Sequence, residues 1–297
     1  MQPTVEVCIL AFGSEAVIGA AVKSASAIPA VSIAVLDHGA RPTSVAAALA
    51  AADRAGLRIR TDADGSNPGF AAGCNRIARG SQADWLVFLN PDAIITAWPW
   101  GPEGPETGHL IGAAQHLPNG DSIDAFGERF GVLEEIRRSW FRRPARRPHG
   151  VGFVGGGACA IERQRFLALG GFDESYFMFY EDIDLGMRAG VAKLPVVVED
   201  RWRVTHAVGH AARRDIGQAV IDSYSSGRRF HAAYGHRVVV YDVFVAMDSV
   251  LRALYWSGRR RPGSARAYVR LAAEALRNAV ARPSLVETRR RAAGSNR

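Results

Sequence analysis

The sequence predicts an α/β fold in which a mostly parallel sheet is flanked by helices and followed by a C-terminal helical extension. Over roughly the first ninety residues, short apolar runs alternate with helical patterns, which is typical of βαβ units. The runs are apolar at nearly every position, as expected for parallel strands that are buried on both faces. From about residue 216 onward the pattern is helical, with a break at Gly258–Gly263.

The N-terminal part alternates strands and helices in a regular order. We expect strands at Val5–Ala11, Val31–Asp37, Leu57–Thr61 and Trp85–Leu89, and helices at Glu15–Ala27, Thr43–Ala55 and near 70–80. Ligands of open parallel sheets bind beyond the carboxyl ends of the strands. The segments that follow strand ends are therefore candidate binding loops: Ala11–Ser14, Asp37–Gly39, Asp62–Asn67 and Asn90–Asp92.

The following part is less regular. A connection rich in Pro and Gly at 97–108 and an irregular, basic loop region at 116–150 separate the predicted elements. We expect strands at His109–Gln115, Val151–Ile161 (split by Gly155–Gly157), Leu194–Val198 and Arg203–His206, and helices at Glu162–Leu169 and from about Tyr180 to Ala189. The predicted domains are 1–212, which contains the sheet, and 213–297, a basic helical region with a disordered end.

The composition is that of a globular protein with a sizeable core. The chain has 297 residues, of which 48% are apolar and 22% charged. Its three widely spaced cysteines argue against a disulfide framework or a structural zinc site and favour a reducing compartment. We find no signal-peptide pattern, and charged residues interrupt the apolar stretch 238–256. We therefore expect a cytoplasmic location.

The net charge of +8 is unevenly distributed. Residues 137–149 contain six arginines and no acid, and 252–297 contain twelve arginines and two acids. Few stacking aromatics accompany them, so we expect no nucleic-acid partner. The stretch 238–281 mixes apolar residues with arginines, as interfacial helices do, which suggests peripheral attachment to an anionic membrane surface on the inner face of the cytoplasmic membrane. The alternative is that these helices pack on the sheet domain and keep their arginines in water.

Two residues at strand ends are candidate metal ligands. Asp92 belongs to Asn90-Pro91-Asp92, directly after the apolar strand WLVFL, and Mg²⁺ or Mn²⁺ is commonly held by carboxylates together with substrate phosphates. His206 ends the last predicted strand, and neutral imidazole is a normal ligand for Mn²⁺-like ions. The alternatives are a simple turn at 90–92 and a structural histidine.

Acidic residues begin the helix predicted after the Gly-Gly-Phe-Asp-Glu turn. One of them could act as a general base on an attacking hydroxyl. Neighbouring helical positions point in different directions, so Glu181 and Asp182 should not both take this role. The acids could instead complement the helix dipole, and Asp184 could pair with Arg188. A Gly-rich entry into another helix at 67–75 could approach an anionic ligand or be an ordinary turn.

Together these segments resemble the family-2 glycosyltransferases, and within them the bacterial rhamnosyltransferase-like group. The resemblance runs from Val5 to about Tyr234. Its most specific stretches are N-P-G-F-A-A-G-C-N (67–75), F-L-N-P-D (88–92), G-G-G-A-C-A-I-E-R (155–163), G-G-F-D-E-S-Y-F-M-F-Y-E-D-I-D-L-G-M-R (170–188) and V-T-H-x-x-G (204–209). Several such blocks in the family's order and spacing make coincidence a poor explanation.

The resemblance implies a Rossmann-like GT-A fold and a metal-dependent, inverting transfer from a nucleoside-diphosphate sugar. The nucleotide-sugar half would be about 1–95 and the acceptor half about 109–212. The cofactor would be Mg²⁺ or Mn²⁺. The acceptor would be a cell-envelope glycan or a polyprenyl-diphosphate-linked sugar, and rhamnose is the sugar that the resemblance favours. The oligomeric state is open.

The resemblance also assigns roles to single residues. Asp182 would be the catalytic base, and Asp92 and His206 would hold the metal. Donor-binding residues would be Ala11, Phe12, Asp37, Asn67, Gly69, Asn90 and Asp92. Acceptor-binding residues would be Gly156, Gly157 and Glu181.

Two loops depart from the family's pattern. Ala11-Phe12-Gly13-Ser14 replaces the usual T-Y-N-S, and 36–42 keeps only Asp37 of the usual V-D-N-x-S-x-D. The chain could therefore be a catalytically silent nucleotide-binding scaffold on the same fold. A nucleotidyltransferase is the other alternative, although it would carry a Gly-rich, lysine-containing loop after the first strand, and this chain has none.

Overall fold

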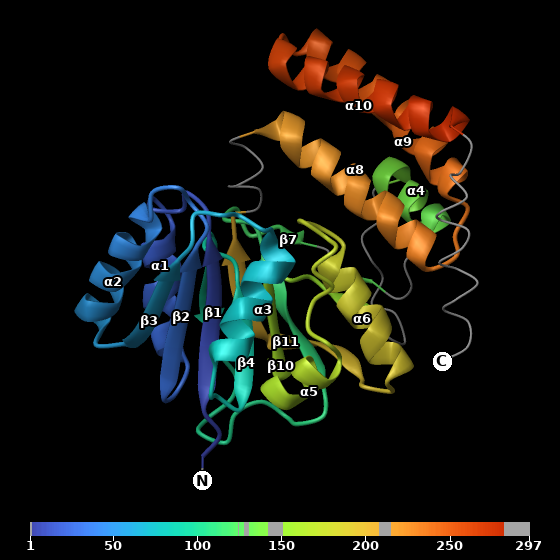
Figure 1. Cartoon of the computed structure of the whole chain (residues 1–297). Helices are drawn as coiled ribbons and strands as arrows, with labels where there is room; N and C mark the ends of the chain where they lie inside the picture. The colour runs from blue at the N-terminus through green and yellow to red at the C-terminus, as the bar shows by residue number, and fades with distance from the viewer. Residues whose placement is uncertain (1, 124, 128–130, 142–150, 208–214, 282–297) are drawn as a thin grey trace. The chain divides into compact units, whose positions relative to one another are not determined.

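The computed structural model describes residues 2–123, 125–127, 131–141, 151–207 and 215–281. The chain forms two compact units, Met1–Asp215 and Ile216–Arg297. The first contains a nine-stranded sheet with the order β3-β2-β1-β4-β10-β6-β11-β5, in which β7 pairs with β6 (Figure 1). The described part of the second consists of helices. The expected boundary at 212/213 lies outside the described residues.

The N-terminal half of the sheet is parallel. Its strands are β1 (Val5–Ala11), β2 (Val31–Asp37), β3 (Arg58–Ala63) and β4 (Trp85–Leu89). Helices α1 (Ile18–Ser24) and α2 (Thr43–Ala55) pack on one face, while α3 (Phe70–Gly80) packs on the other (Figure 1). Ala11, Asp37 and Ala63 are aligned in register, so three strands end in one row. The loops that follow them share one edge of the sheet.

The other half of the sheet is mixed. It contains β5 (Ala93–Ala97), β6 (Leu110–His116), β7 (Ser122–Ile123), β10 (Ala158–Glu162) and β11 (Val196–His206). β10 runs antiparallel between β4 and β6, and β11 is parallel to β6 and antiparallel to β5. Six of the nine strands therefore run in the same direction. The short strands β8 (Phe126–Gly127) and β9 (Phe153–Val154) form a separate pair.

The remaining helices belong to both units. In the first unit, α4 (Val132–Phe141), α5 (Arg163–Ala168) and α6 (Glu181–Val191) follow the strands, and a 3-10 turn covers Ala25–Ala27. In the second, α8 (Ile216–Ala233), α9 (Val238–Gly258) and α10 (Pro262–Val280) follow one another. No helix in the described part of the chain is both long and apolar enough to cross a bilayer.

Aromatic rings fill the core under the second face of the sheet. Phe88 of β4 lies 5.0 Å from Phe166 and 5.1 Å from Phe172, centroid to centroid, and the last two are 5.2 Å apart. All three rings are buried. The edge-to-face and tilted geometries suit the ring quadrupoles. This cluster fixes α5 and the turn before α6 on the sheet, and thereby positions the acidic start of α6.

The predicted elements and the structure differ at three places. β1, β2, α2 and β4 have the predicted bounds, but the region 116–150, predicted as irregular, contains β7, β8 and α4. The prediction missed an amphipathic helix here, because the many arginines of this region are also typical of a loop. The first turn of this helix carries Glu134 and Glu135. β5 was not expected. The two short strands predicted at 194–198 and 203–206 are one strand, β11, because a register shift between Glu199 and Arg203 absorbs the charged residues. The basic residues at 142–149 and 282–297 lie outside the described part.

The aromatic cluster can be tested with two neighbouring substitutions in α5. Phe166 is fully buried and Leu167 is 37% exposed. We expect Phe166→Ala to lower the free energy of unfolding by about 3–5 kcal/mol, because it leaves a cavity beside Phe88 and Phe172. Leu167→Ala should cost less than about 1 kcal/mol. Urea denaturation measures both, and equal losses would contradict the assigned core.

Candidate active site

An acid and a histidine meet where β4 and β11 end. Asp92 follows β4, and His206 is the last residue of β11. Their side chains are almost buried, and His206 Nε2 lies 3.1 Å from Asp92 Oδ1. The pairing of His206 with Ala93 across β5 and β11 brings these positions together. Asn90 Nδ2 is also 3.3 Å from His206 Nε2. The two predicted metal ligands are thus neighbours, although 114 residues separate them.

A second neighbour holds His206 on the other side of its ring. Its Nδ1 lies 2.9 Å from Gln115 Oε1, at the end of β6. An amide oxygen only accepts hydrogen bonds, so Nδ1 is the donor in this contact, and Nε2 is the ring nitrogen that faces Asp92. A carboxylate oxygen and an imidazole nitrogen at this distance suit a shared cation. Gln115 is a supporting residue that the sequence patterns did not reveal.

The donor set fits a divalent cation that shares its coordination with a substrate. Asp92 offers carboxylate oxygen and His206 offers neutral nitrogen, which are ligand types of Mn²⁺-like ions. Across the described ranges, no group of three or more His, Cys, Asp or Glu side chains could hold a metal ion. Asp92 and His206 are two groups that the protein could offer, and phosphate oxygens could supply others.

Two glycines join this pair to the start of α6. The amide of Gly156 donates to Asp182 Oδ2 at 2.8 Å, and the carbonyl of Gly157 accepts from the amide of Asn90 at 3.0 Å. A Cβ on Gly157 would lie 2.7 Å from His206 Cε1, so only glycine allows this approach. The predicted base and the predicted metal ligands are therefore linked by one dipeptide of backbone.

Burial controls the ionisation of the two acids that begin α6. Burial raises the pKa of Asp182, opposed by hydrogen bonds from the amides of Gly156 and Ile183. Burial raises the pKa of Glu181 even further, and the neighbouring charge of Asp182 adds to this effect. Glu181 Oε2 has no hydrogen-bond partner within the described residues. Glu181 thus holds its proton to higher pH, and Asp182 is the better candidate for an ionised base.

At the end of β2, on the same carboxyl edge of the sheet, Asp37 supports the neighbouring loops. Its side chain is fully buried, with Oδ1 accepting from the Gly39 amide at 2.8 Å and Oδ2 from the Ser44 amide at 3.1 Å. Ser44 Oγ accepts in turn from the Ser14 amide at 3.0 Å. Asp37 therefore ties the loops after β1 and β2 to the start of α2.

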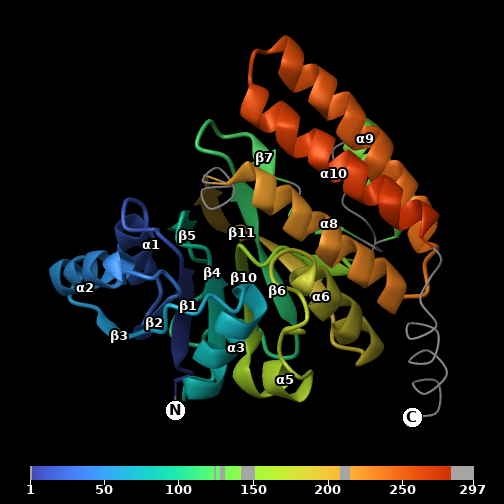
Figure 2. The same ribbon diagram turned by 45° about the horizontal axis from the view of Figure 1, so that its top comes forward.

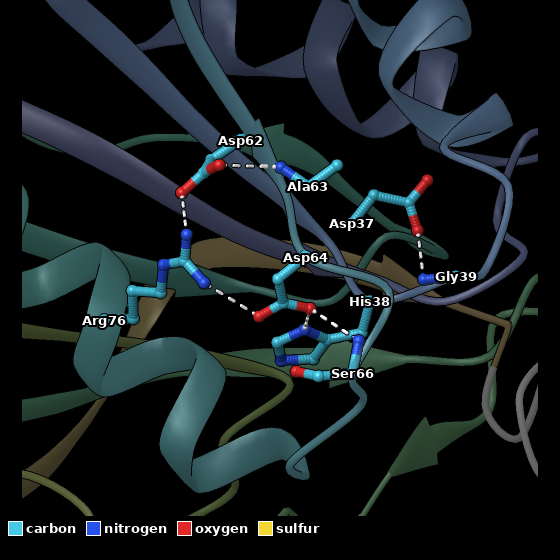
Figure 3. Close-up of polar contacts among 8 residues, drawn as sticks. All are labelled: Asp37, His38, Gly39, Asp62, Ala63, Asp64, Ser66 and Arg76. Atoms are coloured by element: carbon cyan, nitrogen blue, oxygen red, sulfur yellow. Dashed lines mark hydrogen bonds and ion pairs between the residues drawn. The ribbon is translucent and has the colours of Figure 1, made fainter.

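A network that the sequence patterns did not reveal lies at the end of β3 (Figure 3). His38 Nδ1 is 2.8 Å from Asp64 Oδ1, and Arg76 of α3 bonds both Asp64 and Asp62. Burial acts to raise the pKa of Asp64, but hydrogen bonds from His38 and Ser66 outweigh it and lower this pKa. The His38 ring is buried, and its Nε2 has no hydrogen-bond partner in the described chain. His38 replaces the asparagine of the family's V-D-N pattern, and the replacement is bound into this network.

The start of α3 is held by the loop before α6. The Phe70 amide donates to the Phe177 carbonyl at 2.7 Å, and a Cβ on Gly69 would lie 2.4 Å from that oxygen. Asn67 just before it and Tyr180 before α6 both have positive φ, 43° and 70°. Strained backbone of this kind is common at functional sites.

The loop after β1 contains two further predicted donor-binding residues. Phe12 is 46% exposed, and Ala11 is buried.

Comparisons with known proteins bear on the fold and on the sequence. No family model matches the chain. Two solved structures are similar: a mannosyltransferase from Pyrobaculum calidifontis in complex with GDP-Man and Mn²⁺ (15% identity, 99% of this chain and 80% of that one, TM-score 0.54), and GalNAc-T7 with UDP, GalNAc and Mn²⁺ (14%, 69% and 43%, TM-score 0.52).

The fold is GT-A. At these identities the structures show the fold alone. The sequence is also similar to N-acetylglucosaminyl-diphospho-decaprenol L-rhamnosyltransferases from two strains of Mycobacterium tuberculosis, with 29% identity over 197 residues. The match covers 53% of this chain and 61% of each relative, less than two thirds of their length. The resemblance to rhamnosyltransferases is therefore confirmed, and with it the predicted α/β fold class.

The structure separates the predicted site residues into two groups within the GT-A unit. One group converges around His206: Asn90, Asp92, Gly156, Gly157 and Asp182, with Glu181 buried beside it. The other follows β1, β2 and β3 or begins α3: Ala11, Phe12, Asp37, Asn67 and Gly69. Tertiary structure adds Gln115, His38 and Asp64 to these sets.

The close approach at Gly157 can be tested by adding one methyl group. We expect Gly157→Ala to lower the free energy of unfolding by about 1–3 kcal/mol, because its Cβ overlaps the His206 ring. Gly190→Ala is the matched control: nothing lies within 4 Å of its Cβ position, and α6 should gain up to about 1 kcal/mol. Chemical denaturation measures both values. A neutral Gly157→Ala would contradict the packing described.

Proposed function

We propose that this chain is an inverting glycosyltransferase that moves a sugar from a nucleoside-diphosphate sugar to an acceptor hydroxyl. The observation that carries the proposal is the dipeptide Gly156-Gly157, which holds the carboxylate of Asp182 on one side and adjoins Asn90 and His206 on the other. Such a site contains a base and a cation-binding pair within one small volume, which is what a single displacement from a diphosphate requires.

The donor nucleotide would bind at the row of strand ends formed by β1, β2 and β3. Ala11, Phe12, Asn67 and Gly69 would line this pocket, where the loops converge at the carboxyl edge. The main role of Asp37 would be to hold the loops in place, because both of its carboxylate oxygens accept hydrogen bonds from backbone amides. A direct contact between Asp37 and the base or ribose stays a prediction.

The diphosphate would extend from that pocket toward Asn90 and Asp92. Asp92 and His206 would hold a divalent cation, Mg²⁺ or Mn²⁺, which when bound stabilises the negative charge of the departing nucleoside diphosphate. Gln115 keeps the proton on His206 Nδ1, so that Nε2 is available as a ligand. Support comes from the two GT-A structures, which contain Mn²⁺ with a nucleotide or nucleotide sugar.

Asp182 would take the proton of the acceptor hydroxyl as its oxygen attacks the anomeric carbon. The new glycosidic bond forms on the face opposite the bond that breaks, so the anomeric configuration inverts. No enzyme carboxylate has to act as a nucleophile. The amides of Gly156 and Ile183 orient both Asp182 oxygens, and a raised pKa makes the ionised carboxylate a stronger base than an exposed aspartate. Gly156, Gly157 and Glu181 would shape the acceptor side.

Support for a sugar and an acceptor comes from the curated relatives. Their name specifies transfer of L-rhamnose to N-acetylglucosaminyl-diphospho-decaprenol. We infer a related reaction here, with rhamnose as the favoured sugar and a polyprenyl-diphosphate-linked acceptor on the route to a cell-envelope glycan. Because the loops after β1 and β2 depart from the family's pattern, the nucleotide of the donor has to be identified by experiment.

Calorimetric titration of UDP, dTDP and GDP, with and without Mn²⁺, tests the donor site. We expect one nucleotide to bind in a Mn²⁺-dependent manner, and Asp92→Ala or His206→Ala to weaken that binding about 10–100-fold. Asp53→Ala, an exposed acid on α2, is the matched control and should bind as the wild type does. Equal affinity in Asp92→Ala would contradict the metal assignment. Absence of binding by all three nucleotides would favour a silent scaffold.

The pH dependence of transfer tests the base. Because burial raises the pKa of Asp182, its carboxyl keeps a proton to higher pH than an exposed aspartate does. Activity is therefore lost as pH falls through that raised value and regained above it. We expect the acid limb of kcat/KM, measured with dTDP-rhamnose and a polyprenyl-diphosphate-linked N-acetylglucosamine, to lie above the ordinary aspartate range.

Asp182→Asn is the companion substitution. It should lower kcat about 10²–10⁴-fold and remove that limb, while nucleotide affinity is unchanged. Asp53→Asn is the matched control and should keep the wild-type profile. A profile with the same acid limb in Asp182→Asn would assign the base to another residue.

A further inference from the structure

Helix α9 of the second unit exposes an apolar surface that the proposed function does not use. Eight of its large apolar side chains are between 43% and 66% exposed. They are Val239, Val240, Val243, Met247, Val250, Leu251, Leu254 and Tyr255. At about 100° per residue these positions fall on one continuous side of the helix. The charged residues of α9, namely Asp242, Asp248 and Arg252, lie outside it.

Positive charge adjoins this surface along the chain. Tyr255 ends the apolar row, and Arg259, Arg260 and Arg261 follow after three further residues. Helix α10, which packs against α9 (Figure 2), exposes arginines and apolar side chains on a single side. These are Arg266, Arg270 and Arg277 with Val269, Leu276 and Val280. We name the exposed sides of α9 and α10, together with 259–261, the α9–α10 surface.

The acids of this unit leave most of its positive charge uncompensated. Residues 216–281 contain ten arginines and four acids. Two of these acids are ion-paired locally: Asp242 with Arg228, at 3.2 Å, and Asp248 with Arg252, at 2.6 Å. A surface that is both apolar and cationic matches a layer of acyl chains beneath anionic headgroups. Two copies of the chain facing each other here would bring arginines together, which opposes self-association.

We propose that the α9–α10 surface binds peripherally to an anionic membrane. The apolar side of α9 inserts at the boundary of headgroups and acyl chains, and Tyr255 lies at headgroup level, where such rings are enriched. The arginines of α10 and 259–261 contact lipid phosphates, while their aliphatic stems cover apolar surface. This proposal goes beyond the glycosyl transfer proposed above and does not depend on it.

Vesicle flotation of the full chain tests the surface without donor or acceptor. We expect the chain to float with phosphatidylcholine vesicles that contain about 30% phosphatidylglycerol at about 0.05 M salt. Flotation should be much weaker with pure phosphatidylcholine, and weaker at about 0.5 M salt, where the screening length is short. Failure to float with anionic vesicles at low salt, in a preparation that binds nucleotide, would overturn the membrane proposal and leave the proposed function standing. A chain that floats but transfers no sugar would support the membrane proposal and contradict the proposed function.

Two sets of variants separate the apolar and ionic contributions. Met247→Glu with Leu254→Glu should lower the vesicle partition coefficient at least about tenfold. Val191→Glu with Leu133→Glu makes the same changes on the first unit, at positions 85% and 80% exposed, and should float as the wild type does. Arg266→Gln, Arg270→Gln and Arg277→Gln together should lower partitioning on the order of 100-fold at low salt and flatten its salt dependence. Far-ultraviolet circular dichroism confirms that each variant is folded.

Sedimentation velocity without lipid tests the competing occupant, a second copy of the chain. We expect the state of association to be the same in the wild type and in Met247→Glu with Leu254→Glu. A wild-type dimer that becomes monomeric in this variant, together with unchanged flotation of the arginine variant, would overturn the proposal and assign the α9–α10 surface to an interface between copies.

Discussion

The site depends on the close approach of one backbone dipeptide to two strand ends. Gly157 packs against the His206 ring while its carbonyl holds the Asn90 amide, and Gly156 holds Asp182. A Cβ on Gly157 would displace the His206 ring, whereas a Cβ on Gly156 would make only ordinary contacts. The missing side chain of Gly157 therefore lets the backbone that holds the candidate base approach the candidate metal ligands.

Exclusion of water gives the same region its chemical character. Glu181 is buried and Asp182 is partly buried, and desolvation raises the pKa of both carboxyls. Hydrogen bonds from the amides of Gly156 and Ile183 oppose this effect at Asp182, which makes Asp182 the better candidate for the ionised partner. The same burial raises the pKa values of Cys74 and Cys159, so these thiols stay protonated beside the acids.

Parallel pairing accounts for the donor edge. Because Ala11, Asp37 and Ala63 are aligned, the loops that depart from them start at the same level. Asp37 then joins the first two loops through backbone amides, and Asp64 joins the third loop to α3 through Arg76 (Figure 3). Two of the substitutions that depart from the family's pattern, Phe12 and His38, lie on this scaffold. Phe12 is exposed, whereas the buried ring of His38 is part of the network itself.

The sequence by itself determined the order of the elements and the fold class. Continuous apolar runs between helical periods define buried parallel strands, and for this reason the bounds of β1, β2, α2 and β4 were predictable. The motif blocks also selected Asp92, Asp182 and His206. Tertiary structure alone decided that Gln115 accepts a hydrogen bond from His206 and that Gly157 has no room for a side chain, because these contacts join residues far apart in the chain. It also decided that α4 is a helix, that β11 is continuous across its register shift, and that Glu181 and Asp182 are desolvated. Pairing and burial are properties of packed neighbours, which local periodicity does not encode.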